Sequence, residues 1–343
     1  MARRILWGSL VLTPVAILAR FVFHLDETSL FVLAAVALIP LAWLIGEATE
    51  HAAEHTGPGV GGFLNASFGN APELIIALFA VADSLPGVVR GSLTGSVVSN
   101  ILLVLGAAMI AGGDGKVDAR SLRWQLFAVF GAVAFLAIPS ALAWNGSSQD
   151  RHSLFILSIP ISAVLLFAYL GITWQNLRIH RAAERVEPAA HAWSFRRSLA
   201  VLAVATAATA LVSEILVHSL GHFGEAVGLN QFFIAVVIVA IVGNAAEHGG
   251  AVVIARRGNT TLATEIAITS SMQVAVFVAP AVCLLSWIVG RGLPLSFRVV
   301  EIATMAAAAL FAAIVVADGR SRRWEGFLLV GVYGAVVVWY LLA

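Results

Sequence analysis

Long apolar stretches, separated by short polar segments, make up almost the whole chain. A run of about 20 apolar residues is long enough to cross the hydrocarbon core of a bilayer as one helix. The pattern predicts eleven such helices, at residues 5–23, 29–55, 59–84, 88–112, 122–145, 152–177, 196–219, 229–256, 260–289, 297–317 and 323–342. We therefore expect an all-α polytopic membrane protein.

Composition agrees with this prediction. Of the 343 residues, 60% are hydrophobic and only 11% are charged, which lies outside the range of soluble proteins. The net charge of +1 gives no indication of a nucleic-acid partner. Cys283 is the one cysteine, so an intrachain disulfide and a cysteine-based zinc site are excluded. We expect the lipid bilayer as the surroundings of the chain, and no cofactor.

The basic residues indicate how the helices are oriented. If the N-terminus with Arg3 and Arg4 is cytoplasmic, the even-numbered connections between helices are cytoplasmic as well. Those connections hold Lys116, Arg120, Arg123, Arg178, Arg181, Arg185, Arg196, Arg197, Arg256, Arg257, Arg320, Arg322 and Arg323. The positive-inside rule thus predicts a cytoplasmic N-terminus and an external C-terminus, in the inner membrane of a bacterium.

The chain repeats itself at a separation of 174 residues. This shift places residues 69–71 on 243–245, both Gly-Asn-Ala, and it also places Glu73 on Glu247, Ser96 on Ser270 and Ser99 on Gln273. Helices two to six then match helices seven to eleven, and an odd number of spans gives the two units opposite orientations. We expect an extra helix in residues 1–28, inverted five-helix repeats at 29–177 and 196–343, and a cytoplasmic linker at 178–195.

Two Gly-Asn-Ala-x-Glu segments, at residues 69–73 and 243–247, are the strongest candidates for chemistry. Each places a carboxylate within an apolar span, where insertion costs about 2.5 to 3.5 kcal/mol. Asn and Glu three residues apart share one helical face. Two such pairs around one point offer carboxylate and amide oxygens, which suit a hard divalent cation such as Ca²⁺. The predicted ligands are Glu73, Glu247, Asn70 and Asn244.

The same segments predict an interruption of their helices. The glycine before each Asn permits a break or a close approach of another helix. Pro72 has no backbone N–H, so the carbonyl of Phe68 loses its helical donor.

Polar side chains on two further helices are candidates for the rest of the site. Ser96 and Asn100 are four residues apart, and Ser270 and Gln273 are three apart, so each pair shares one helical face. Together with Ser99, these side chains either complete the site or hold its glutamates through hydrogen bonds. For the serines, ordinary packing of small residues between helices is the alternative.

Residues 50–55 (Glu-His-Ala-Ala-Glu-His) admit three interpretations. His51, Glu54 and His55 fit the H-x-x-E-H pattern of zinc peptidases, so an intramembrane metallopeptidase is an alternative of a different class. The run, including Glu50, is also suited to an entrance for cations or protons. The third interpretation is a cluster in contact with lipid headgroups. Glu214 is a candidate counterpart of Glu50 in the second half.

Three more titratable residues lie in apolar stretches. His248 follows Glu247 and points about 100° away from it on a helix. We expect His248 to orient a neighbour or to relay protons, and a hydrogen-bonded core histidine is the alternative. The sequence assigns no role to Glu265 and Glu301.

At these residues the chain resembles the calcium/proton (cation/proton) exchanger family. The likeness extends over helices two to eleven and rests on residues 62–78, 95–106, 243–248 and 270–273. It implies eleven spans, a calcium-binding pair at Glu73 and Glu247, and a surrounding site of Asn70, Asn244, Ser99 and Gln273. The acidic linker that many members carry is reduced here to Glu184 and Glu187, and Pro72 stands where such proteins often have Thr or Val.

The resemblance also implies a function, the export of Ca²⁺ from the cytoplasm with H⁺ as counter-ion. Two carboxylates in a low-dielectric site cannot both stay ionised without metal, so binding of Ca²⁺ expels protons. One site that opens alternately to each side would then exchange the two ions. Coupling to Na⁺ or another monovalent cation is the nearer alternative. The oligomeric state does not follow from the sequence.

Overall fold

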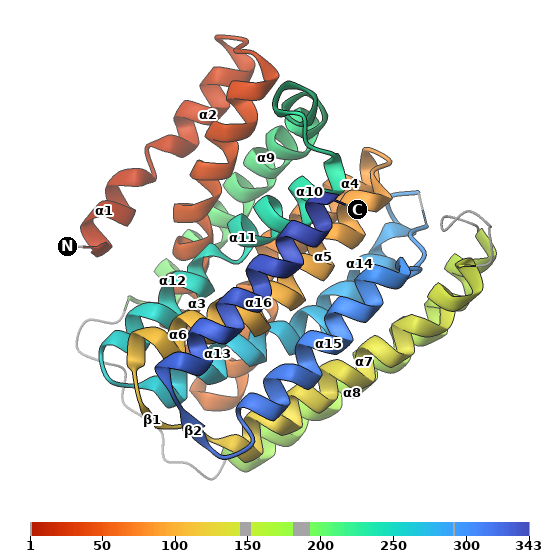
Figure 1. The fold of residues 1–343 in the computed structure, drawn as a ribbon. Coiled ribbons are helices and arrows are strands. Elements are labelled where there is room, and N and C mark those ends of the chain that lie inside the picture. The colour runs from red at the N-terminus through yellow and green to blue at the C-terminus, as the bar shows by residue number, and fades with distance from the viewer. Residues whose placement is uncertain (1, 145–151, 181–192, 291, 343) are drawn as a thin grey trace. The chain divides into compact units, whose positions relative to one another are not determined.

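The structure is a computed structural model that describes residues 2–144, 152–180, 193–290 and 292–342 (Figure 1). Two short strands, β1 (Gly115–Lys116) and β2 (Arg320–Ser321), are the only strands in these ranges. The helices are α1 (Ala2–Ser9), α2 (Leu12–Phe21), α3 (Glu27–Gly69), α4 (Ala71–Ala82), α5 (Pro86–Ser99), α6 (Leu105–Gly112), α7 (Ala119–Ala143), α8 (His152–His180), α9 (Phe195–Val227), α10 (Gln231–Phe233), α11 (Ala240–Gly243), α12 (Ala245–Arg256), α13 (Thr260–Gln273), α14 (Ala279–Ser286), α15 (Val299–Val315) and α16 (Arg323–Leu342). Three π-helical turns join some of them, η1 (Asn100–Val104), η2 (Ile234–Val239) and η3 (Val274–Val278).

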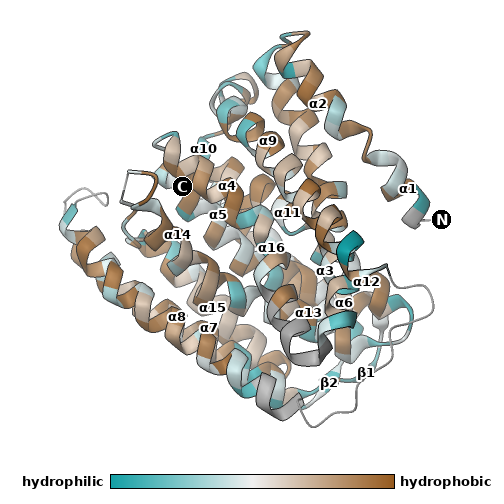
Figure 2. Cartoon of the chain, turned by 180° about the vertical axis from the view of Figure 1, so that it is seen from behind, coloured by the Kyte–Doolittle hydropathy of each residue, from teal (hydrophilic) through white to brown (hydrophobic). Residues whose placement is uncertain are grey.

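Eight helical stretches among the described residues are long and apolar enough to cross a membrane. A ninth is the pair Gln231–Gly243 and Ala245–Arg256, which bends by 57° at Asn244, as the Gly-Asn motif predicts. Two shorter apolar helices, α4 and α15, fall on the remaining predicted stretches. In Figure 2 most of the helical ribbon has the colour of hydrophobic residues, and hydrophilic residues mark several helix ends. The expectation of a helical membrane protein is confirmed.

The predicted boundary between the second and third helices is wrong. Instead of ending near residue 55, the helix continues as α3 through Gly69, over 43 residues. A single proline removes one backbone hydrogen bond, and membrane helices tolerate that loss, so Pro58 does not end the helix. The helix ends at Asn70 instead. The linker prediction concerns mainly residues 181–192, which lie outside the described ranges.

The repeat found in the sequence is also present in the boundaries of the helices. A shift of 174 residues places α4 on α12, α5 on α13, η1 on η3 and α6 on α14. In each pair the two elements then begin and end at the same positions. Side-chain similarity and backbone conformation therefore follow the same register over this stretch of the two halves.

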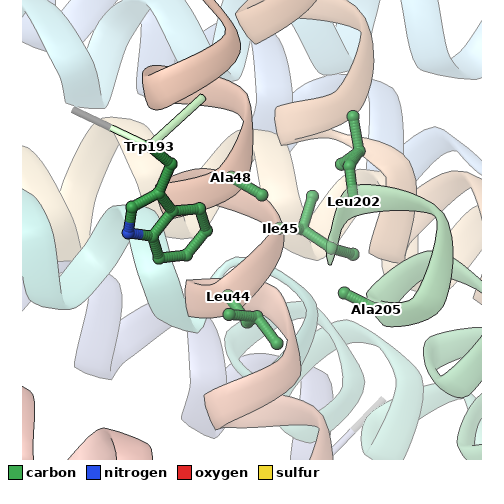
Figure 3. Packing of buried hydrophobic residues seen from close by; sticks show 6 residues of the cluster. All are labelled: Leu44, Ile45, Ala48, Trp193, Leu202 and Ala205. Carbon is green, nitrogen blue, oxygen red and sulfur yellow. The ribbon is translucent and has the colours of Figure 1, made fainter. Parts of the chain in front are cut away.

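The chain forms two compact units, each built from both halves of the sequence. The first contains residues 1–79, 167–228 and 242–246. In this unit α3 packs along α9, and α2 packs on both. Figure 3 shows part of this core, where Leu44, Ile45 and Ala48 of α3 lie near Leu202 and Ala205 of α9 and near Trp193. Asp26 caps α3 by accepting from the backbone N–H of Ser29, and hydrogen bonds from Ser29 lower the pKa of Asp26.

The second unit contains residues 80–166, 229–241 and 247–343. Here α5 packs against η2, α7 against α13 and α15, and α6 against α16. The contact between α5 and η2 is very close. A Cβ atom on Gly95 would lie 2.0 Å from the backbone oxygen of Val236, so only glycine fits there.

Three predicted cytoplasmic connections meet in the second unit. β1 and β2 pair antiparallel, with Lys116 opposite Arg320 (Figure 1). The hydroxyl of Thr261, in the first turn of α13, donates to the carbonyl of Lys116. Asp318 accepts from the backbone N–H of Arg320, which lowers the pKa of that carboxyl, and it pairs with Arg322. The basic residues of these connections therefore gather at one end of this unit.

Candidate cation site

The first motif lies where α3 ends and α4 begins. Asn70, at the junction, has φ −91° and ψ 11°, outside the helical region, and its backbone N–H donates to the carbonyl of Phe68. The carbonyl that Pro72 deprives of a helical donor thus accepts from a residue two positions earlier, Asn70. Glu73 lies in the first turn of α4, where the helix dipole favours a carboxylate. The side chains of both motif residues are buried.

The second motif supplies the backbone that packs against Glu73. A Cβ atom built on Gly243 would lie 3.4 Å from Cγ and 3.8 Å from Oε1 of Glu73. Gly243 thereby provides close approach, and Asn244 follows it as a buried side chain at the bend. The first unit therefore brings the glutamate of one motif against the glycine of the other.

The second glutamate belongs to a hydrogen-bonded chain in the second unit. Glu247, in the first turn of α12, accepts from the hydroxyl of Ser270. The Ser270 oxygen accepts from Nδ2 of Asn100 at 3.1 Å, and Oδ1 of Asn100 lies 3.2 Å from Nε2 of His248. Residues from both halves of the sequence thus converge here. Of the predicted residues, Ser270 bonds to Glu247 directly, and Asn100 joins the same hydrogen-bonded series through Ser270.

The hydrogen bonds of Asn100 indicate which ring nitrogen of His248 acts as a donor. Asn100 uses its NH₂ group toward Ser270, so its oxygen faces His248 and accepts a hydrogen bond. Nε2 of His248 is then the donor. The ring points to Asn100 and not to Glu247, in line with the expected orientation of about 100° between neighbours on a helix.

The other predicted polar residues lie beside two π-helical turns. Ser96 and Ser99 are buried near the end of α5, and the Ser99 hydroxyl donates to the carbonyl of Ser96 at 3.4 Å. Asn100 begins η1, and Gln273 is the half-buried residue before η3. A π-helical turn rearranges the usual carbonyl pattern, and such turns are frequent at functional sites. The sequence did not indicate these turns.

Residues 47–55 form a separate cluster on α3 in the first unit. Nε2 of His51 lies 3.7 Å from Glu47, and Nδ1 lies 3.8 Å from Glu54. Nε2 of His55 is hydrogen-bonded to the carbonyl of Trp193 at 2.6 Å. No group of three or more His, Cys, Asp or Glu side chains suited to a metal occurs among the described residues. The cluster therefore lacks the arrangement that a zinc peptidase requires.

Two predicted accessory carboxylates, Glu50 on α3 and Glu214 on α9, are exposed.

Two contacts of the structure were not predicted from the sequence. One is Trp193, whose ring lies 4.6 Å from that of His51. The other is Gln125, which bonds to Glu265 and Thr269. A glutamine within the apolar stretch 122–145 was the available signal for the second contact.

The sequence is similar to those of known proteins. The family described as "Sodium/calcium exchanger protein" matches residues 27–177 and 197–342. The chain is 34% identical over 355 residues to a Ca²⁺/H⁺ antiporter of Aphanothece halophytica, covering 96% of this chain and 94% of that protein. It is 36% identical over 333 residues to the Ca²⁺/H⁺ antiporter ChaA of Bacillus subtilis, covering 93% of both.

The fold is also similar to a solved structure. The structure of native YfkE superposes with a TM-score of 0.85 at 32% sequence identity, covering 99% of this chain and 100% of that one.

Proposed function

Because the chain belongs to the sodium/calcium exchanger protein family, we propose that it is a secondary active antiporter that exports Ca²⁺ from the cytoplasm in exchange for H⁺. It is an integral membrane transporter and not an enzyme, like the antiporters it resembles. The observation that carries the proposal is the likeness to two Ca²⁺/H⁺ antiporters over more than nine-tenths of their length. Ca²⁺ is a substrate, and no cofactor takes part.

We assign the transport and proton-coupling roles to Glu73 and Glu247. Each lies in the first turn after a helix break. Glu73 packs against Gly243 of the other half of the sequence, and Glu247 reaches Asn100 of the other half through Ser270. Two carboxylates and several neutral oxygens suit the six to eight oxygen ligands of Ca²⁺. The neutral ligands are proposed to come from Asn70, Asn244, Ser96, Ser99, Asn100, Ser270 and Gln273.

The exchange follows from competition between the metal and protons. Without metal, two carboxylates in a low-dielectric site favour the uptake of at least one proton. Ca²⁺ favours both anions and expels the protons. A site that opens alternately to each side then carries either ion, and an inward proton gradient drives Ca²⁺ outward.

For the architecture we propose one extra helix at 1–28 followed by two inverted five-helix repeats, eleven spans in all. The matching boundaries of α4 to α6 and α12 to α14 support the repeat. The gathering of Lys116 and Arg320 at one end of the second unit supports a common side for their connections. By the positive-inside rule this is the cytoplasmic side of a bacterial inner membrane, with the N-terminus inside and the C-terminus outside.

We further propose that residues near the ends of the path assist the passage of ions. The cluster of His51 with Glu47 and Glu54 places a titratable ring between two carboxylates, an arrangement suited to proton relay. His248 is assigned to the orientation of Asn100. The accessory group consists of Glu50, His51, Glu54, His55, Glu214 and His248.

Proton release from proteoliposomes tests the function. Vesicles that contain the purified protein and a trapped pH dye receive Ca²⁺, Na⁺ or K⁺ in turn. We expect Ca²⁺ alone to drive proton efflux, with Ca²⁺ uptake in a fixed ratio. Ca²⁺ uptake that follows an imposed Na⁺ gradient and moves no protons would instead establish coupling to Na⁺.

A further inference from the structure

Helix α13 carries a polar stripe of which the proposed site uses only the last residue, Gln273. After its first turn, the only positions of α13 that are not fully buried are Glu265, Ile266, Thr269 and Gln273. Three of the four are polar and recur every four residues, so they share one helical face. The stripe leads from the end of the helix beside the basic connections to Gln273, about 12 Å further along the axis.

The composition of this stripe differs from that of surfaces suited to lipid. Exposed positions on α8 and α16 are occupied by large apolar side chains, such as Phe167 at 73% exposure and Phe327 at 62%. Facing lipid, a carboxylate would be costly, and ionisable residues in spans normally face a water-filled path or the protein interior. The α13 stripe therefore has the character of the lining of an aqueous path.

Glu265 is held in this stripe by neutral groups. Its Oε2 accepts from Nε2 of Gln125 at 2.6 Å, and Nε2 of Gln125 also donates to the hydroxyl of Ser121 at 3.2 Å. The other end of the same amide accepts from the hydroxyl of Thr269 at 2.7 Å. This clamp between α7 and α13 fixes a carboxylate, an amide oxygen and a hydroxyl oxygen close together.

The charge of Glu265 has no ionic partner among the described residues, since no Lys, Arg or His lies within ion-pair distance of it. The other embedded acid, Glu301, differs in this respect. It lies 3.9 Å from Nε of Arg298 and also experiences the charge of Arg90. Glu301 is thus compensated within the protein, whereas Glu265 is free to attract a cation from solution.

The equivalent face of α5 is closed. Displacement by 174 residues places Glu265 on Gly91 and Thr269 on Gly95, both buried. A Cβ atom on Gly91 would lie 3.1 Å from Phe232 and from Ala235. The polar stripe is therefore a feature of the second half alone.

We propose that Glu265, with the oxygens of Gln125 and Thr269, is a second binding site for the transported divalent cation, on the path to Gln273. The proposal rests on the function proposed above. One carboxylate with neutral oxygen ligands binds Ca²⁺ more weakly than a site with two carboxylates. Glu265 therefore raises the local concentration of the ion and passes it on without retaining it.

The test is the Ca²⁺ dependence of proton release from proteoliposomes, measured for the wild-type protein, Glu265→Gln and the control Glu225→Gln. The amide introduced at 265 still accepts from Gln125, so the clamp is retained while the charge is lost. We expect the half-saturating Ca²⁺ concentration to rise about three- to tenfold in Glu265→Gln, with an unchanged maximal rate. Glu225 is exposed at the end of α9, and its variant should match the wild type.

Ionic strength separates a role of the charge from a structural role. Raising KCl from about 0.05 to about 0.5 M shortens the screening length to a few Å and should bring the wild type and Glu265→Gln together. Gln125→Ala, which removes the clamp and leaves the carboxylate, should shift half-saturation less than Glu265→Gln. An unchanged half-saturation in Glu265→Gln, or a fall in its maximal rate alone, would overturn the inference.

A cysteine variant gives an independent test. Since Cys283, the one native cysteine, is fully buried, a thiosulfonate reagent added to Glu265→Cys reacts at position 265 alone. A sulfonate-bearing reagent should restore half-saturation, and a trimethylammonium reagent should worsen it. The same result with both reagents, or no reaction, would contradict an accessible cation site. Absence of Ca²⁺/H⁺ exchange in the wild-type protein would contradict the proposed function itself. Normal exchange in the wild type, with no effect of the substitutions at Glu265, would contradict only the second cation site.

Discussion

The two copies of the repeat share the boundaries of α4 to α6 and α12 to α14 but differ in the contacts around their glutamates. In the first copy, Glu73 packs against the backbone of Gly243, and η2 covers the face of α5 that carries Gly91 and Gly95. In the second copy, Glu247 is bonded to the hydroxyl of Ser270, and the equivalent face of α13 is polar and half exposed. One carboxylate therefore packs against a glycine of the other copy, and the other accepts a hydrogen bond from a serine of its own copy.

This difference shows that the repeat keeps parts of the backbone alike in the two copies, while the side chains around the glutamates differ. The break before each glutamate and the π-helical turns η1 and η3 recur at the same positions, whereas η2 has no counterpart in α3. The side chains around those positions are free to specialise. We therefore expect substitutions at the two glutamates to have equal effects, and substitutions around them to differ between the copies.

The largest expected effect is the loss of exchange in Glu73→Gln and in Glu247→Gln. Removing one charged partner from a buried site costs about 3 to 5 kcal/mol, which corresponds to a loss of at least about 100-fold. Initial rates of Ca²⁺-driven proton release measure this loss, with Glu225→Gln as the control. Full activity in either variant would mean that the substituted glutamate takes no part in exchange and that the two copies are not equivalent.

The next effect concerns the packing of the first copy. In Gly95→Ala the new methyl group would overlap the backbone oxygen of Val236, so α5 and η2 must separate. Overpacking of this kind costs about 3 kcal/mol or more. We expect a clear fall in the thermal unfolding temperature of the detergent-solubilised protein.

Gly131→Ala is the matched control for Gly95→Ala, because nothing lies within 4 Å of the position of its Cβ atom. That variant should be as stable as the wild type or slightly more stable, since alanine favours helix. Equal unfolding temperatures for the two variants would show that α5 is not closely packed.

A smaller effect is expected at the hydroxyl group that supports the second glutamate. Ser270→Ala removes the donor to Glu247 and the acceptor for Asn100. A hydrogen bond to a charged group contributes about 1.5 to 3 kcal/mol, so transport at low Ca²⁺ should fall about tenfold. Ser92→Ala, which removes only a bond to the carbonyl of Val89 within α5, should retain wild-type rates. Equal transport rates in the two serine variants would contradict a role of the Ser270 hydrogen bond in supporting Glu247.

The smallest effect is expected at Gly243. In Gly243→Ala the methyl group would lie 3.4 Å from Cγ of Glu73, an ordinary contact that restricts the carboxylate without expelling it. We expect the half-saturating Ca²⁺ concentration to change by about two- to threefold. Gly171→Ala, with open space at its Cβ position, is the control. A change at Gly171 as large as that at Gly243 would mean that general helix stiffening is responsible.

The parts of the fold that follow from local sequence were predictable. Apolar length predicted the helices, and the Gly-Asn dipeptides predicted the interruption at Asn244 because glycine permits conformations that other residues avoid. The end expected near residue 55 was wrong because membrane helices tolerate the one backbone hydrogen bond that a proline removes. The π-helical turns depend on packing between distant segments, such as α5 with η2, and leave no local signal.

The candidate site was predictable where the residue types are unusual for a membrane span. Glu73 and Glu247 stand out because a carboxylate in an apolar segment is costly and recurs at one spacing. The bond between Asn100 and Ser270 joins residues 170 positions apart, and no sequence pattern specifies that pairing. Glu265 was visible as an embedded acid, but its contact with Gln125 required the packing of α7 on α13.

The central claim is that Ca²⁺ and protons compete for the two motif carboxylates. Calorimetric titration of the purified protein with Ca²⁺, in two buffers of different ionisation enthalpy at the same pH, measures the protons released per ion bound. We predict proton release in the wild type, together with an affinity for Ca²⁺ that rises with pH. Binding heats that are equal in both buffers, with an affinity independent of pH, would contradict the claim.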